Sequence, residues 1–410
     1  MSPAFLRATA MVVVALPAFA TAAPFTLDEA VDVAIRRSEL ARSGRAGVAS
    51  ASAMADASRE LPDPVLRLAL EDLPVTGADR FRTARDSMTT KRIGLAQEWL
   101  SVDKRSARQA AADAAVDREA VTLQAAIAGT RLQTTLAYLD SYYAAEALKL
   151  TTLTRHHAEE ELGLSRARLA SASGSGQEVL GFASAVGLAE DDAAEAAQQH
   201  EVADVALARW VGFHADTLAP AAPFSIPDEA AYVIRHPSVM ALRRDTDAAQ
   251  RAVTVAATNR RPNWTWEVGY AQRTGFSDLF TVGVSIPLAI ARDRRQDRET
   301  AAKAALVDRA DADVAEAVRL ATAEYRTLIG NRQRLSERIA RYRQAVVAVA
   351  EQRTSAATAG YRSNQGSLVT LFEARHAEVE GRRKLLALER ELAKTEAELA
   401  LRPLSDEGSR

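Results

Sequence analysis

The densest group of side chains that could hold a metal ion lies in the middle of the chain. His156 and His157 are followed by Glu159, Glu160 and Glu161. Neighbouring residues on a helix point about 100° apart, so the two histidines do not chelate one ion together, whereas His156 and Glu160 share a face. Two ligands are too few for a selective site. The pattern therefore favours a solvated helix face, and we predict no metal site.

The chain contains no other pattern typical of an enzyme or a cofactor site. The remaining histidines, at positions 200, 214, 236 and 376, are scattered, and no zinc-protease, serine-hydrolase or phosphate-loop motif occurs. The absence of cysteine excludes disulfides, thiolate metal sites and an acylated N-terminal cysteine. A net charge of −2 gives no field that would attract nucleic acid. We predict no catalytic residues, no cofactor and no nucleic-acid partner.

The first 23 residues have the features of a secretory signal peptide. Arg7 precedes an apolar run over residues 8–19, and a small-residue cleavage site follows at 20–22. Beyond this segment, no window approaches the roughly 18 consecutive apolar residues that a transmembrane helix needs. We therefore expect an exported protein whose membrane insertion, if any, uses strands.

The rest of the chain shows an internal duplication. The segment that begins at Leu27 returns at Pro227, and Pro62-Asp63 returns as Pro262-Asn263, both at a separation of 200 residues. Gly174-Ser175 similarly matches Gly366-Ser367. We predict a first structural repeat over residues 24–222 and a second over 223–410. Each would contain short helices, a β-hairpin and a long helical hairpin, in that order.

Proline positions show where the long helices can form. No proline lies between Pro74 and Pro220 or between Pro287 and Pro403, and proline breaks helix interiors. The segment from Asp103 to Arg168 would alone form a helix about 100 Å long. Turn-forming residues at 170–176 and 363–366 divide each interval into two helices. Abundant alanine and few aromatic residues suit long helices in side-by-side contact.

Four segments alternate between apolar and polar residues, with the period of two that predicts strands. In exported proteins this pattern is also typical of membrane barrels, with an apolar outer face and a polar lumen. The candidate lipid-facing residues are Leu66, Leu68, Leu70, Trp264, Trp266, Tyr270, Phe280, Val282 and Val284. The candidate lumen-lining residues are Arg67, Glu71, Arg92 and Glu267.

The same alternation also suits a soluble sheet that packs on the helices. The number of strands bears on this choice, because single-chain membrane barrels need at least about eight strands. Four strands would have to be pooled among several chains, and three copies would supply twelve. The membrane interpretation therefore requires an oligomer.

Several stretches of the mature chain resemble one known family. They are Arg260-Arg261-Pro262-Asn263-Trp264, residues 282–288, the helix starts at 103–105 and 292–295, and the segment Tyr361-Arg362-Ser363-Asn364-Gln365-Gly366-Ser367. In these residues the chain resembles the TolC-like outer-membrane efflux proteins, nearest the heavy-metal subgroup of CzcC-like and CusC-like channels. Asn364 stands where relatives often have glycine, and asparagine also tolerates a positive φ. Residues 354–372 contain no acidic residue, so we do not expect an acidic cation filter there.

The resemblance implies a mainly α fold with a small antiparallel β part. Long helical hairpins would form a periplasmic α-barrel, and four strands per protomer would enter a trimeric outer-membrane β-barrel. The implied partners are two further copies of the chain, outer-membrane lipid, a periplasmic adaptor (membrane fusion protein) and an inner-membrane efflux pump. The adaptor-docking tips would be Ser173, Gly174, Ser175, Asn364, Gly366 and Ser367.

The expected function is passive conduction from a periplasmic adaptor and pump to the exterior, with heavy-metal cations as the expected substrates. Two alternatives remain. One is an outer-membrane channel for drugs or small organic molecules. The other is a soluble periplasmic coiled-coil adaptor, although an adaptor would normally have one helical hairpin rather than two.

Overall fold

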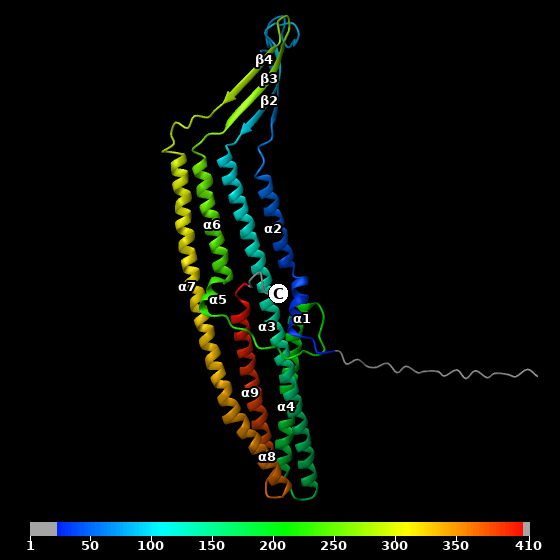
Figure 1. Ribbon diagram of the computed structural model, residues 1–410. Helices are drawn as coiled ribbons and strands as arrows, with labels where there is room; N and C mark the ends of the chain where they lie inside the picture. The colour runs from blue at the N-terminus through cyan, green and yellow to red at the C-terminus, as the bar shows by residue number, and fades with distance from the viewer. Residues whose placement is uncertain (1–22, 405–410) are drawn as a thin grey trace, which may run out of the picture.

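A computed structural model describes residues 23–404 as a long rod of helices (Figure 1). The predicted signal peptide lies almost wholly outside the described residues. The helices are α1 (Leu27–Arg37), α2 (Glu39–Ala57), α3 (Val102–Ala170), α4 (Gly176–Val211), α5 (Glu229–Ile234), α6 (Pro237–Thr258), α7 (Gln296–Tyr342), the π-helical η1 (Arg343–Val347), α8 (Ala348–Arg362) and α9 (Leu368–Leu401). The strands are β1 (Val65–Glu71), β2 (Thr90–Trp99), β3 (Trp264–Arg273) and β4 (Leu279–Ser285). A sheet lies at one end of the rod, and the turns that connect α3 to α4 and α8 to α9 lie at the other.

Each half has the same order of two helices, two strands and a long helical hairpin. The predicted helix from Asp103 to Arg168 is confirmed, since α3 spans 69 residues. Serine side chains start the helices of the hairpins: Ser101, Ser175 and Ser367 each accept a hydrogen bond from a backbone N–H in the first turn of α3, α4 and α9. Such caps satisfy donors that a helix start otherwise leaves unpaired.

The long helix of the second half differs from α3. Between α7 and α8, five residues in π conformation, η1, interrupt it. The proline spacing gives no sign of this interruption. A π segment adds a residue to a helical turn and is a recognised cause of helix bending. Gly381 of α9 faces it, and a Cβ there would lie 3.6 Å and 3.7 Å from the side chains of Val346 and Val347. A Cβ would thus be in ordinary contact with the widened turn, and a larger side chain on α9 would overlap it.

The sheet joins the two halves of the chain. Its order is β1-β2-β3-β4, every neighbouring pair is antiparallel, and the central pair comes from different halves. Within residues 23–404, the outer edges of β1 and β4 have no partner strand. The structure therefore confirms a mainly helical fold with a small antiparallel sheet.

The helices pack through small side chains and a few large ones rather than around one thick core. One cluster near α5 contains Tyr232, Val239 and Leu399, all fully buried. A second cluster contains Tyr138 of α3, whose hydroxyl lies 2.7 Å from the carbonyl oxygens of both Phe25 and Ala219 and shares its one proton between them. Tyr138 therefore ties the first described residues and the segment between the halves to α3.

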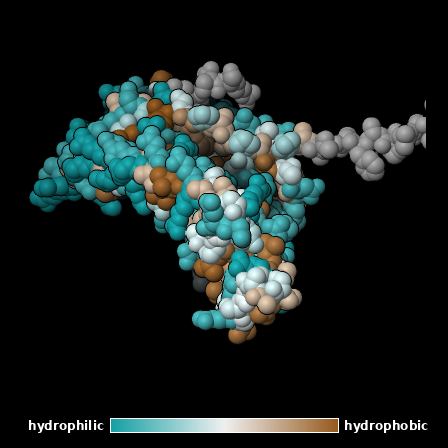
Figure 2. Space-filling model, turned by 90° about the horizontal axis from the view of Figure 1, so that it is seen from below, coloured by the Kyte–Doolittle hydropathy of each residue, from teal (hydrophilic) through white to brown (hydrophobic). Residues whose placement is uncertain are grey.

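The rod is not a closed ring by itself. Seen along its long axis from the end that carries the turns, the chain forms an open, bent body on which hydrophilic and hydrophobic residues are interspersed (Figure 2). Among residues 23–404, no helix combines the length and apolar character required to cross a membrane.

Candidate functional site

The sheet has one apolar face that the rest of the described chain leaves uncovered. All nine predicted lipid-facing residues lie on it, and their exposed fractions range from 38% for Trp266 to 74% for Phe280. The sheet extends beyond the ends of the long helices instead of lying against them (Figure 1). The alternative of a sheet that packs on the helices is therefore wrong. The alternation alone could not exclude it, because both arrangements need one apolar face.

The four predicted lumen-lining residues lie together on the opposite face of the sheet. Arg67 of β1 and Glu267 of β3 form an ion pair of 2.7 Å, although β2 lies between their strands. Gly94 of β2 lies beneath this pair: a Cβ there would be 3.5 Å from the Glu267 Oε1 atom, which is ordinary contact, and 3.2 Å from the Val268 carbonyl oxygen, so a larger side chain would crowd the pair. Arg92 and Glu71 form a second pair at 3.4 Å.

Two tryptophans mark the end of the sheet nearest the helices. Trp99 and Trp264 are direct partners in the β2–β3 register, and both are about half exposed. Trp264 was among the predicted lipid-facing residues, and Trp99 lies on the same face. Tryptophan is the residue typical of the boundary between an apolar layer and water.

A polar network connects the sheet to the first turn of α3. Lys104 is only 4% exposed, and its Nζ atom donates to the Asn263 side chain at 2.8 Å and to the Arg261 carbonyl at 3.1 Å. Asn263 in turn donates to Glu98 at 2.5 Å. Burial, with a smaller effect of Arg108, lowers the pKa of Lys104. The sequence singled out Lys104 as part of a basic helix start but gave no sign that it is buried.

The predicted docking tips lie side by side at the end of the rod away from the sheet (Figure 1). In the second turn, Asn364 has a φ of +61°, which confirms that it takes the left-handed conformation. In the first turn, that conformation falls on Ala172, with a φ of +58°, and not on a glycine. Gly174 instead allows close approach, since a Cβ would lie 3.2 Å from the Leu169 backbone nitrogen.

The His and Glu segment lies on α3, toward the tips, and only part of it is solvated. His156 and Glu160 are exposed and 3.3 Å apart, as their shared face predicts. Glu161 is different, because it is 1% exposed and pairs with Arg375 of α9 at 3.1 Å. Successive side chains on a helix point about 100° apart, so Glu161 points toward α9 while Glu160 points toward solvent. The prediction of a solvated face is therefore wrong for Glu161, and burial raises its pKa to about 7.

Metal-ligating side chains do not converge in the described part of the chain. Residues 23–404 contain no group of three or more His, Asp or Glu residues arranged to hold an ion.

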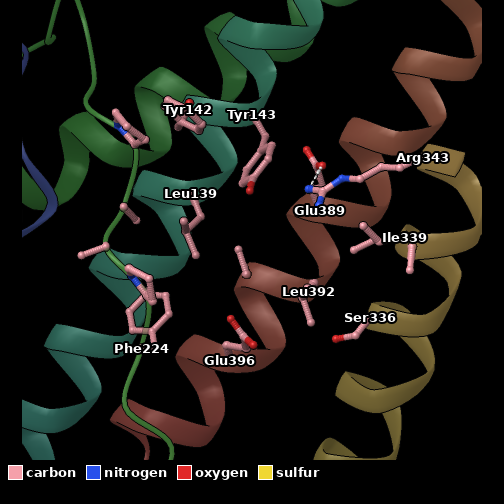
Figure 3. A pocket seen from close by; sticks show the side chains of 16 residues that line it. Leu139, Tyr142, Tyr143, Phe224, Ser336, Ile339, Arg343, Glu389, Leu392 and Glu396 are labelled. Atoms are coloured by element: carbon pink, nitrogen blue, oxygen red, sulfur yellow. Dashed lines mark hydrogen bonds and ion pairs between the residues drawn. The ribbon is translucent and has the colours of Figure 1, made fainter. Parts of the chain in front are cut away.

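A cavity of about 530 Å³ lies where the segment between the halves crosses the long helices (Figure 3). Leu139 and Tyr143 of α3 form one wall, and Ile339 of α7 and Leu392 of α9 lie opposite. The Arg343–Glu389 ion pair, at 2.6 Å, lies at its rim. Sequence reasoning did not identify this cavity, because its walls come from segments up to 257 residues apart, from Leu139 to Glu396.

Comparison with known proteins adds a structural likeness. No family model and no curated protein sequence matches the chain. Among solved structures, the outer membrane protein VceC from Vibrio cholerae matches with a TM-score of 0.74 at 18% identity, over 92% of this chain and 96% of that one. The CmeC outer membrane channel of Campylobacter jejuni has a TM-score of 0.75 at 14% identity, over 94% and 87%.

CusC, whose crystal structures concern transmembrane channel formation, has a TM-score of 0.72 at 15% identity, over 92% of this chain and 91% of that one. At these identities the likeness establishes a shared fold over nearly the whole length of each chain.

Proposed function

We propose that this protein is an outer-membrane exit channel of a tripartite efflux system. The observation that carries the proposal is the sheet: one face is apolar and exposed, the other carries paired charges, and neither edge has a partner strand among residues 23–404. Such a sheet suits a barrel wall between lipid and water. The solved structures with the same fold include proteins described as outer membrane channels, which supports the same conclusion.

In this proposal, the unpaired outer edges of β1 and β4 require pairing with further copies of the chain. Unpaired backbone groups at β1 and β4 cannot remain exposed in a bilayer, because no water is present there to satisfy them. Antiparallel pairing of β4 with β1 of a second copy would satisfy both edges. A trimer would close a barrel of twelve strands, and the bent helical bodies would then surround a periplasmic tunnel.

The charged face would line the lumen of this barrel. Arg67, Glu71, Arg92 and Glu267 contribute two positive and two negative charges, and each is already paired. A balanced, paired surface tunes ion passage and does not bind a substrate tightly. This suits a passive conduit, with an inner-membrane pump as the source of energy.

The turns at the far end of the rod would meet the periplasmic adaptor. Residues 171–175 and 363–367 carry small or polar uncharged side chains and are exposed or half-buried. Docking there would spread the hairpins and widen the closed tip of the tunnel. Engineered disulfides that join neighbouring tips are expected to abolish export, and unchanged export would contradict this step.

For the substrate we propose heavy-metal cations, on the resemblance to the heavy-metal subgroup. Deletion of the gene followed by tolerance measurements against metals, dyes and antibiotics tests this point. A selective loss of metal tolerance is expected. Broad sensitivity to drugs would instead favour the channel for small organic molecules.

The test of the channel itself is fractionation with an assembly measurement. The full chain is expected in the outer-membrane fraction, and as a trimer after extraction in mild detergent. Recovery as a soluble periplasmic monomer would refute the proposal and would favour the coiled-coil adaptor.

A further inference from the structure

We propose that the segment between β4 and α7, together with the first residues of α7, binds the head groups of anionic phospholipids at the periplasmic side of the membrane. This head-group segment comprises residues 286–298. The inference rests on the proposed function, because it requires the sheet to lie in an outer membrane.

The apolar face of the sheet continues into the head-group segment after β4 has ended. Val282 and Val284 lie on that face, and the same spacing continues at Ile286 and Leu288. A tight turn follows, in which the N–H of Ile290 donates to the carbonyl of Leu288 at 3.0 Å. Leu288 is 79% exposed and Ile290 is 90% exposed. Because they continue the apolar face of the sheet, they belong to one contiguous exposed patch, which is typical of a surface that contacts a membrane or another protein.

The register of the sheet places the start of this segment at the membrane boundary. Ser285 pairs with Thr265, so Ile286 follows at the level of Trp264. Trp264 in turn pairs with Trp99. If this tryptophan pair marks the edge of the hydrocarbon layer, residues that follow Ile286 toward the helices lie among the head groups.

Positive charge begins just where the apolar residues end. Four arginines within seven residues are all exposed: Arg292, Arg294, Arg295 and Arg298.

The carboxylates nearby do not neutralise these arginines. Asp297 is held at 2.8 Å by Arg260, which lies between α6 and β3, and Asp293 approaches Arg294 only at 3.9 Å. With Glu299 also counted, the four arginines exceed the two remaining carboxylates by two charges. Guanidinium groups beside exposed apolar side chains complement a surface of lipid phosphates, which adds attraction for each basic residue.

The charges also favour lipid over a second copy of the chain as the occupant. If β4 pairs with β1 of another copy, the residues that arrive beside this segment are those that precede Val65. These include Arg59, Glu60 and Asp63, with a net charge of −1. That is too little to neutralise the head-group segment. An anionic lipid surface has no such limit, because it supplies as many phosphates as the arginines can reach.

The test uses the purified full chain in neutral detergent, with phosphatidylglycerol or phosphatidylcholine added, and measures retained lipid by native mass spectrometry. The wild type is expected to retain more phosphatidylglycerol. In the triple variant Arg292→Gln/Arg294→Gln/Arg295→Gln, the ratio of retained phosphatidylglycerol to phosphatidylcholine is expected to fall about tenfold. A matched triple of exposed α7 arginines, Arg309→Gln/Arg319→Gln/Arg338→Gln, is expected to keep it.

A second variant, Leu288→Ser/Ile290→Ser, tests the apolar part. It is expected to reduce retention of both lipids by a similar factor while the preference remains. Equal retention of the two lipids by the wild type would overturn the inference, as would an unchanged preference in the first triple variant. Loss of the oligomer in that variant without added lipid would show that the segment contacts a second copy, and would also overturn it.

Failure of the proposed function is recognised separately. Wild-type protein that is absent from the outer-membrane fraction would refute the channel. Wild-type protein that is present there, but does not prefer phosphatidylglycerol, would refute only the head-group segment.

Discussion

Arg67 and Glu267 occupy equivalent positions in the two halves, 200 residues apart in the sequence, and form a 2.7 Å ion pair across β2. Positions 67 and 267 therefore carry opposite charges that meet in the sheet. Two properties of β2 allow this contact: Gly94 has no side chain, and Ala96, which pairs with Glu267, has only a methyl group. The charged face is thus joined across the boundary between the halves.

Neutralising this pair is expected to change ion selectivity more than stability. Arg67→Gln should shift a reconstituted channel toward cations, and Glu267→Gln toward anions, because each leaves one charge unbalanced. Each should change the free energy of unfolding by less than about 1 kcal/mol, since the pair is partly exposed. Reversal potentials in planar bilayers measure the shifts. The exchanged pair Arg67→Glu/Glu267→Arg is the control, and selectivity that neither single variant changes would place this face outside the lumen.

Lys104 is expected to be essential for the joint between sheet and helices. Lys104→Met would leave the carbonyl of Arg261 and the side chain of Asn263 without their buried donor. An unsatisfied buried polar group costs about 1–3 kcal/mol, so we expect a loss of that size in the free energy of unfolding. Urea unfolding in detergent measures it. The exposed Lys384→Met of α9 is the matched control, and equal losses in the two variants would contradict the role of the network.

The features that sequence predicted depend on local periodicity. Alternation over residues 264–270 and the proline-free interval after Pro74 indicate strand and helix without knowledge of any partner. The missed features depend on contacts between distant segments. Lys104 meets residues 157 and 159 positions away, and Glu161 meets Arg375 across 214 positions. No local pattern distinguishes a buried carboxylate of this kind from one on a solvated helix face.

The second long helix shows the same limit. Residues 343–347 have ordinary helical propensity, so sequence gives no reason to expect a π turn there. The turn faces Gly381 of α9, 34 positions after Val347, and that packing becomes visible only in the folded chain.

Glu161 is expected to make stability depend on pH between about 4.5 and about 7. Burial outweighs the attraction of Arg375 and raises its pKa to about 7, whereas the ordinary value is 4.5. As the pH rises through this window, the unfolded chain loses a proton that the folded chain still holds. The free energy of unfolding therefore falls with rising pH, by about 1–3 kcal/mol from this group, and changes little on either side.

Urea unfolding from pH 4 to pH 8 measures this dependence, with Glu161→Gln as the variant that should lose it. Glu159→Gln is the matched control, because Glu159 is about half exposed and pairs with Arg155 on its own helix. His157 and His376 also line the small cavity beside Glu161, and both remain in the two variants. A pH profile that is the same in wild type and Glu161→Gln would contradict the prediction.

Gly381 is expected to tolerate a methyl group but not a larger side chain. A Cβ there would be in ordinary contact with Val346 and Val347, so Gly381→Ala should gain about 0.5–1 kcal/mol from helix propensity. Gly381→Leu should lose about 1–3 kcal/mol, because the extra atoms would overlap η1. Thermal unfolding measures both. Gly163 of α3, with no neighbour within 4 Å of a Cβ, is the control at which leucine should be accepted.

Replacing Ala172 by glycine is expected to stabilise the turn between α3 and α4. At a φ of +58° the methyl group of alanine is strained by about 1 kcal/mol, which glycine avoids. Ala170→Gly, two residues earlier at the end of α3, should instead destabilise by up to about 1 kcal/mol, because its backbone is helical. Opposite signs in thermal unfolding would separate relief of strain from a general effect of glycine. If both substitutions destabilise, Ala172 does not hold the left-handed conformation. The added stability applies to the conformation that the turn has in this structure. An adaptor that changes this conformation on docking would therefore bind Ala172→Gly less tightly than the wild type.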